Sequence, residues 1–159
     1  MNLVVGYDEH PASRVALKFA ARLAAQFDAE LNIVHVLTLD DYPIDPDGRD
    51  WEERADREVV IEREAAERIL QAHDVKGWTY DVVSGDPVRR LVDACEKHDA
   101  LMIIVGKPEH GFGAMLNHLA TGSISRGLLH TGHRPVVIVP ENGIVREGRA
   151  GKGSRRHHD

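Results

Sequence analysis

Short apolar segments alternate with longer segments of helical spacing along almost the whole chain. Each apolar segment is bounded by glycine, proline or charged residues, which is typical of buried strands. The predicted strands are residues 3–7, 30–37, 78–83, 100–106 and 134–140. The predicted helices are residues 11–27, 51–73, 88–98 and 122–130, with a further short helix expected at 115–119. Because strands that alternate with helices are joined by right-handed crossovers, this order predicts an α/β fold with a parallel sheet covered on both faces.

Two of the predicted helices differ in how clearly their buried face can be read. In residues 11–27, Pro11 suits the first turn, and Val15, Phe19, Leu23 and Phe27 follow one another at i, i+4 steps, which predicts an apolar stripe. In residues 51–73, Glu62 interrupts the apolar positions. The residues of the second helix that are expected toward the core, on either side of Glu62, are Ala55, Val59, Ala66, Ile69 and Leu70.

The apolar content of the strands predicts their place in the sheet. Residues 100–106 form the most apolar run in the chain and are expected at the centre. Residues 78–83 alternate between polar and apolar side chains, which favours an edge position.

Composition excludes several classes of protein. With 159 residues, the chain has the length of one domain, and its single cysteine, Cys95, excludes an intramolecular disulfide and a multi-cysteine metal site. A net charge of −6 argues against broad binding to nucleic acid. No apolar stretch reaches the ~18 residues of a membrane helix, so we expect no membrane partner and a cytoplasmic location. The predicted division is a domain at 1–140 and a flexible basic tail at 141–159.

Ligands of such sheets bind where the strands end at their carboxyl edge, and one segment there has the residues for an anion. Gly106 ends the predicted central strand, and residues 122–125 (Gly-Ser-Ile-Ser) open the next helix. Glycines allow close approach of backbone to a phosphate, and the N–H groups of a helix start favour negative charge. The alternative is a simple turn followed by a serine N-cap.

Asp8 directly follows the first predicted strand. An aspartate at this place can accept hydrogen bonds from ribose hydroxyls or hold a metal ion, or it can cap the helix that begins near Pro11. Two familiar phosphate motifs are missing: no lysine of the P-loop type follows the glycines, and the segment beginning at Gly111 has only part of a dinucleotide fingerprint. There is no Gly-x-Ser-x-Gly elbow either, so no catalytic residue is predicted.

Over roughly residues 1–140 the chain resembles the universal stress proteins. The segments that carry this resemblance are residues 5–8 with the alanine-rich helix after them, 31–36, 85–87, 99–106, 122–125 and 135–140. The resemblance implies a single-domain, flavodoxin-like layout with a five-stranded parallel sheet of order 3-2-1-4-5. It also implies a stress-response binding or signalling module in which ATP or another adenine nucleotide binds where the strand order reverses, with any hydrolysis slow.

Carried over by position, the resemblance implies a role for each residue of a nucleotide site. Asp8 would hold the ribose or the Mg²⁺ of the nucleotide, Val36 would offer backbone groups to adenine, and the glycines and serines would bind the phosphates. The implied residues are Gly6, Asp8, Val36, Gly106, Gly111, Gly122, Ser123, Ile124 and Ser125.

The sequence departs from the pattern of the nucleotide-binding members in one loop. Glu109 stands where the pattern has its second glycine, and the segment from there to Gly122 is longer. Gly111 is the glycine that could take its place if the loop is rearranged. The alternative function is therefore a dimeric interaction protein of the same fold whose nucleotide site has degenerated.

The last predicted strand favours a homodimer. Residues 136–139 are apolar on both faces, and an edge strand with unpaired backbone groups is a template for a second chain. The expected interface is Pro135, Val136, Val137, Ile138 and Val139. The alternative is that a loop or the tail covers this edge. The resemblance also implies a homodimer paired through this strand.

Overall fold

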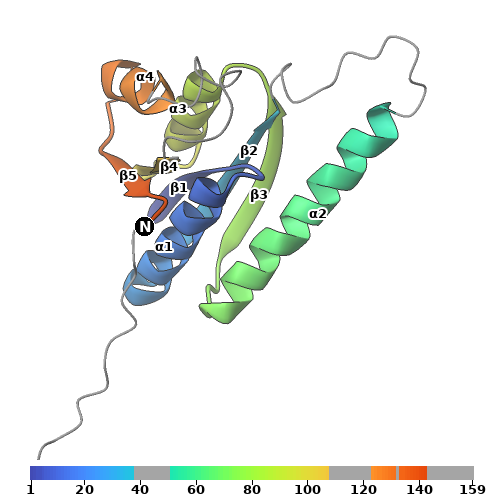
Figure 1. The fold of residues 1–159 in the computed structure, drawn as a ribbon. Coiled ribbons are helices and arrows are strands. Elements are labelled where there is room, and N and C mark those ends of the chain that lie inside the picture. Colours follow the sequence, from blue (N-terminus) through green and yellow to red (C-terminus); the bar gives the residue numbers. More distant parts are fainter. Residues whose placement is uncertain (38–50, 108–122, 132, 143–159) are drawn as a thin grey trace, which may run out of the picture.

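The computed structural model describes residues 1–37, 51–107, 123–131 and 133–142, and its strands form one parallel sheet of order β3-β2-β1-β4-β5 (Figure 1). The strands are β1 (Asn2–Tyr7), β2 (Glu30–Leu37), β3 (Trp78–Ser84), β4 (Ile103–Lys107) and β5 (Val136–Pro140). The helices are α1 (Pro11–Phe27), α2 (Trp51–Ala72), α3 (Pro87–Lys97) and α4 (Ser123–Thr131). The predicted fold class and strand order are confirmed.

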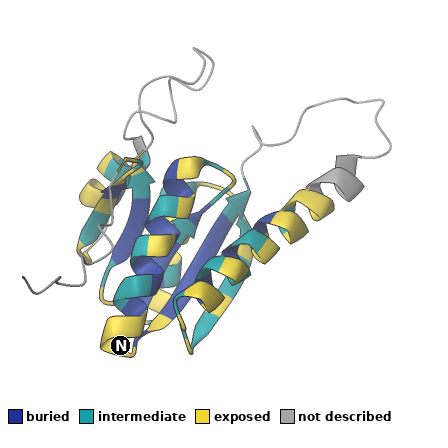
Figure 2. Cartoon of the chain, turned by 60° about the horizontal axis from the view of Figure 1, so that its bottom comes forward, coloured by how far each residue is buried: buried dark blue, intermediate teal, exposed yellow. Residues whose placement is uncertain are grey.

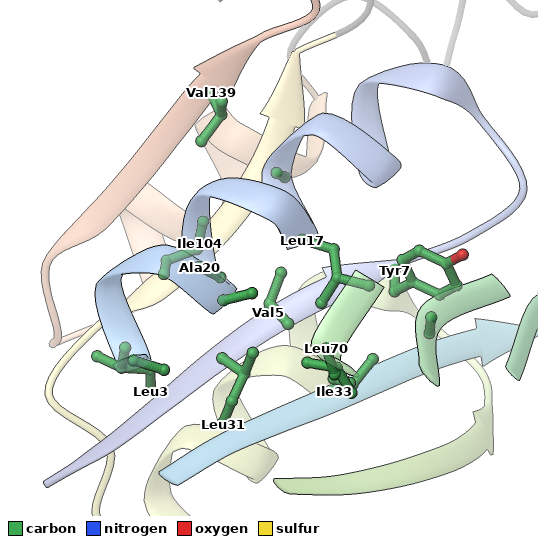
Figure 3. Packing of buried hydrophobic residues seen from close by; sticks show 14 of the residues in the cluster. Leu3, Val5, Tyr7, Leu17, Ala20, Leu31, Ile33, Leu70, Ile104 and Val139 are labelled. Atoms are coloured by element: carbon green, nitrogen blue, oxygen red, sulfur yellow. The ribbon is translucent and has the colours of Figure 1, made fainter. Parts of the chain in front are cut away.

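The helices cover the two faces of the sheet in pairs, α1 with α2 and α3 with α4 (Figure 1). Between α1, α2 and the sheet lies a cluster that includes Val5, Leu17, Ile33 and Leu70 (Figure 3). A second cluster lies under α3 and α4 and includes Val4, Leu91 and Leu128. Buried residues are concentrated in the central strands, as Figure 2 shows.

The buried face of α1 differs from the predicted stripe. Its fully buried positions are mostly alanines, among them Ala16, Ala20 and Ala24, while Phe27 is 61% exposed. Val15, Phe19 and Leu23 are only partly buried at the margin of the cluster. Small side chains allow α1 to lie close to the sheet, so the large residues flank the contact instead of forming its centre.

The central strand β4 is shorter than the apolar run that predicted it. Residues 100–102 precede the strand and are held by other bonds: the Ala100 N–H donates to Cys95 O, and the Leu101 N–H donates to Asn2 O. Asp99 has a φ of 45°, which turns the chain out of α3 before the strand begins. The central position itself is confirmed, because β4 lies between β1 and β5.

The two edges of the sheet are β3 and β5, as expected for the alternating segment and the last segment. Among the helices that the structure describes, none is long and apolar enough to span a membrane. The predicted short helix at 115–119 lies outside the described residues, as does nearly all of the predicted tail.

Candidate functional site

The strand order reverses at β1, so Asp8 and the carboxyl ends of β2 and β4 lie around one point of the sheet edge. From β1 the chain proceeds through β2 to β3 on one side, then crosses over to β4 and β5 on the other. Loops therefore leave in opposite directions on either side of β1, which opens a crevice in folds of this kind. Asp8 is the first residue after β1 and lies at that point.

A short chain of hydrogen bonds shapes the turn that carries Asp8. The Asp8 N–H donates to Ser13 Oγ at 3.0 Å, and this hydroxyl donates to Gly6 O at 3.3 Å. The carboxylate of Asp8 accepts from the His10 N–H at 3.0 Å. His10, and not Asp8, occupies the N-cap position of α1, so the predicted alternative role of Asp8 as the cap is not what the structure shows. We call residues 8–13 the Asp8 turn.

The surroundings of Asp8 favour its ionised form. Burial opposes ionisation, but hydrogen bonds from His10 and Ser13 and the charge of His10 outweigh it, so the pKa of Asp8 lies below its usual value. The Nδ1 atom of His10 lies 3.3 Å from Asp8 Oδ1 and 3.6 Å from Glu9 Oε1. A carboxylate in this state can accept from two ribose hydroxyls or contact a cation.

Asp8, Glu9 and His10 offer one ligand atom each within 4.8 Å of one another. Two of these atoms are carboxylate oxygens, the ligand type that Mg²⁺ prefers, and the third is an imidazole nitrogen, which it does not. The set therefore fits a nucleotide-borne Mg²⁺ in part, through Asp8 and Glu9.

The backbone of Val36 is directed toward β1. Alternate residues of a parallel strand turn their N–H and C=O groups to opposite neighbours. The Glu30 N–H donates to Met1 O, next to β1, and Leu37 O accepts from the Gly85 N–H, next to β3. The even-numbered residues of β2 therefore turn their backbone groups toward β1, and Val36 is one of them. The β1–β2 ladder ends at Tyr7↔His35, one residue before Val36. Val36 thus presents backbone groups where β1 leaves the sheet.

Gly6 and Gly106 differ in how closely other parts of the chain approach them. A Cβ at Gly106 would lie 2.4 Å from Ala12 O, so the first turn of α1 crosses directly over this residue. A Cβ at Gly6 would meet Leu91 and Val105 side chains at 3.4 Å. Close approach of α1 therefore explains the glycine at 106, whereas a Cβ at Gly6 would make only ordinary contacts with side chains of α3 and β4. A phosphate contact at Gly106 stays a prediction.

The helix predicted from residues 122–125 begins at Ser123, as α4. Ile124 packs against the cluster under α3 and α4, as Val36 does from β2, so the start of α4 and the end of β2 share one side of the sheet. Ser125 is half-buried. Gly111, Gly122 and Glu109, which belong to the loop that departs from the family pattern, lie outside the described residues.

Sequence reasoning missed a group of buried polar side chains beside the Asp8 turn. Glu62, which interrupts the apolar face of α2, is buried and contacts Tyr7 and Arg14. Next to them, Nδ1 of His35 lies 2.9 Å from the hydroxyl of Tyr80. The only sequence signal was Glu62 itself, because a carboxylate within a buried stripe requires a partner.

Comparison with known proteins gives the family. A sequence model of the universal stress protein family matches residues 1–140. Universal stress protein Rv2623 of Mycobacterium tuberculosis is 29% identical over 154 residues, covering 91% of this chain and 49% of the relative. Universal stress protein MJ0531 of Methanocaldococcus jannaschii is 24% identical, covering 86% of this chain and 80% of the relative. The chain thus spans about half the length of its mycobacterial relatives.

Solved structures share the fold. A universal stress protein in complex with cAMP matches with a TM-score of 0.66 at 20% identity, covering 89% of this chain and 97% of the other. Universal stress protein UspA from Lactobacillus plantarum matches with a TM-score of 0.67 at 18% identity, covering 87% and 96%. One from Archaeoglobus fulgidus in complex with dAMP matches with a TM-score of 0.62 at 20% identity, covering 87% and 96%. With the family match over residues 1–140, the chain belongs to the universal stress protein family.

Proposed function

We propose that this protein binds ATP or another adenine nucleotide at the carboxyl edge of β2, β1 and β4. The observation that carries the proposal is Asp8: it lies where the strand order reverses, and its carboxylate accepts a hydrogen bond from the His10 N–H, which favours the ionised form. An ionised acceptor at such a point suits the hydroxyls of a ribose.

Each part of the ligand has candidate partners around Asp8. The ribose is assigned to Asp8, and the adenine edge to the backbone of Val36, which is directed to the same place. The phosphates are assigned to the start of α4, where Ser123, Ile124 and Ser125 follow Gly122. Gly106 allows the first turn of α1 to lie close to the end of β4, Gly6 lies in β1 just before Asp8, and Gly111 is assigned to the phosphate loop by sequence alone. When Mg²⁺ accompanies the nucleotide, Asp8 is its assigned contact.

Two structural neighbours support this class of ligand. One neighbour is a complex with cAMP and another a complex with dAMP, both adenine nucleotides. These ligands belong to those proteins, and for this chain they indicate which nucleotides to test first.

We propose further that the protein acts as a stress-response binding or signalling module and not through a dedicated active site. Any hydrolysis of ATP is expected to be slow. We propose a homodimer formed by pairing of β5 with its copy across Pro135, Val136, Val137, Ile138 and Val139. In the described residues β5 pairs with β4, and its outer edge has no second strand partner.

Isothermal titration of ATP, AMP and cAMP, each with and without Mg²⁺, tests the proposed ligand. Asp8→Ala should weaken binding by about tenfold or more, equivalent to about 1.4 kcal/mol. Asp93→Ala is the matched control, since it removes an exposed carboxylate from α3 that lies 3.7 Å from Arg90. Equal affinities of wild type and Asp8→Ala would contradict the site. No binding by wild type at millimolar nucleotide would favour the alternative, a dimeric interaction protein.

A further inference from the structure

We infer that Glu62 of α2 is a positioning residue that holds the Asp8 turn in the shape that receives the nucleotide. The inference rests on the proposed function for its ligand, although the positioning itself can be measured in the ligand-free protein. It concerns a helix that contributes none of the predicted site residues.

The two oxygens of the Glu62 carboxylate contact residues on both sides of the Asp8 turn. The Tyr7 hydroxyl donates to Oε2 at 3.1 Å, and Arg14 Nη2 donates to Oε1 at 2.8 Å. Tyr7 immediately precedes Asp8, and Arg14 immediately follows Ser13, whose hydroxyl accepts from the Asp8 N–H. One carboxylate thus connects the residue before the turn to the residue after it.

Burial limits how far Glu62 and Tyr7 can move without losing their hydrogen bond. Glu62 is 7% exposed and Tyr7 is 3% exposed, so neither can exchange its partner for bulk water without moving. Figure 3 shows Tyr7 within the core cluster, its hydroxyl at the margin. A buried carboxylate is stable only with charged or hydrogen-bonding partners in place. Displacing Tyr7 therefore breaks a buried contact that water cannot readily replace, whereas Arg14, whose side chain is 46% exposed, is held by its ion pair with Glu62.

Stability of α2 alone does not account for a carboxylate at this position. The buried positions that follow on the same helix are Ala66 and Leu70, and a leucine at 62 would continue that stripe. Apolar residues often serve at least as well as a buried ion pair for stability. One turn before Glu62 on the same face, Val59 is half-buried and Glu58 is exposed, so burial decreases from Glu62 toward the N-terminus of α2.

This placement couples α2 to the site. In sequence, residues 38–50 connect β2, with Val36 near its end, to the start of α2. Glu62 therefore ties the helix that follows the assigned adenine contact to the turn that carries the assigned ribose contact. A shift of α2 and a shift of the Asp8 turn are expected to occur together.

Amide hydrogen exchange tests the positioning without a ligand. Glu62→Leu removes both contacts and places an apolar, helix-forming side chain at this position. We expect exchange at the Asp8 and His10 N–H groups to accelerate by about fivefold or more, because local opening governs exchange at such sites. Glu67→Leu is the matched control: it replaces another α2 glutamate, which pairs with exposed Arg63 at 3.1 Å. Equal acceleration in both variants, or none in Glu62→Leu, would overturn the inference.

Nucleotide titration tests the consequence for binding. Glu62→Leu should weaken the affinity by about tenfold or about 1.4 kcal/mol, with Glu62→Gln in between because its amide oxygen can still accept from Tyr7. In an Asp8→Ala background Glu62→Leu should cause no further loss, since the residue acts through the turn. An unchanged affinity in Glu62→Leu would overturn the inference. If wild type binds no nucleotide, the proposed function fails, and the exchange experiment still decides whether Glu62 holds the turn.

Discussion

The first turn of α1 passes over Gly106 with its backbone and not with side chains. Because the nearest atoms are Ala12 O at 2.4 Å and Ser13 N at 2.9 Å from a Cβ placed at 106, no rotamer change can make room. The same turn holds Ser13, which binds the Asp8 N–H. At the residue scale, one glycine therefore supports both the packing of α1 and the shape of the candidate site.

Gly106→Ala should lower the free energy of unfolding by about 1–3 kcal/mol or more, since α1 or β4 must shift to admit a methyl group. Urea unfolding followed by circular dichroism measures the effect. Gly77→Ala is the control, because a Cβ there meets only the flexible Glu30 side chain, at 3.1 Å. An equal effect of both substitutions would show that the close approach at Gly106 is not limiting.

Cys95, the single cysteine of the chain, is 1% exposed. Burial raises the pKa of its thiol, and the nearby charge of Arg134 only partly opposes this. Because the thiol pKa is higher in the folded state, the protonated thiol makes its full contribution to the free energy of unfolding below the unfolded-state pKa of about 8.5. This contribution is lost as the pH rises through the folded-state pKa.

A thiol reagent such as dithionitrobenzoate should therefore react slowly with native protein at pH 8 and rapidly in denaturant. The free energy of unfolding should fall between pH 8 and pH 10 more steeply in wild type than in Cys95→Ala. Rapid labelling of the native protein would contradict this account of the thiol.

At the scale of elements, the start of α3 is set by local chemistry. Gly85 has a φ of 128°, the carboxylate of Asp86 accepts from the Arg89 N–H at 2.8 Å, and Pro87 occupies the first turn. These are the residues that typically begin a helix. The helix could therefore be located from the sequence, and the structure agrees.

Asp86→Ala should lower the free energy of unfolding by about 1 kcal/mol, the usual loss of an N-cap. Thermal and urea unfolding measure it, with Asp93→Ala of the same helix as control. If the two variants are equally stable, the cap bond contributes nothing beyond the removal of a surface charge.

Elements whose signals are local were predictable, and those decided by distant partners were not. The spacing of apolar residues predicted the strands, the helices and the parallel sheet, and the family resemblance implied the strand order. The turn residues before α3 predicted where that helix begins. The buried face of α1 was predicted only in part: Val15, Phe19 and Leu23 pack against the cluster, but Phe27 is exposed. The centre of this face is formed mostly by alanines, whose small side chains let the helix lie close to the sheet. The partners of Glu62 lie 55 and 48 residues away in sequence, so no spacing could indicate them. The residues of the site were assigned by resemblance, and their role stays a prediction.

At the scale of the whole molecule, the edge strands β3 and β5 each pair with only one strand among the residues that the structure describes, and the two edges can be compared. Ile138 on β5 is 37% exposed, and Val82 on β3 is 40% exposed. Ordinary monomers protect such edges with charged residues or covering segments. The proposed dimer uses the β5 edge.

Ile138→Lys should convert the dimer to a monomer in light scattering coupled to gel filtration, because a buried lysine in the paired strands would lack a partner. Val82→Lys places the same charge on the opposite edge and should leave the dimer intact. A monomeric wild type, or dissociation by Val82→Lys alone, would contradict the assigned interface.

The central claim is that an adenine nucleotide binds where β2, β1 and β4 end around Asp8. The most direct measurement is a titration of isotope-labelled protein with AMP and then ATP, followed by amide chemical shifts in NMR. The account predicts saturable shifts concentrated at Asp8, Val36, Gly106 and Ser125, with the N-terminal ends of the strands unchanged. Absence of shifts at millimolar nucleotide, or shifts concentrated away from this edge, would contradict it.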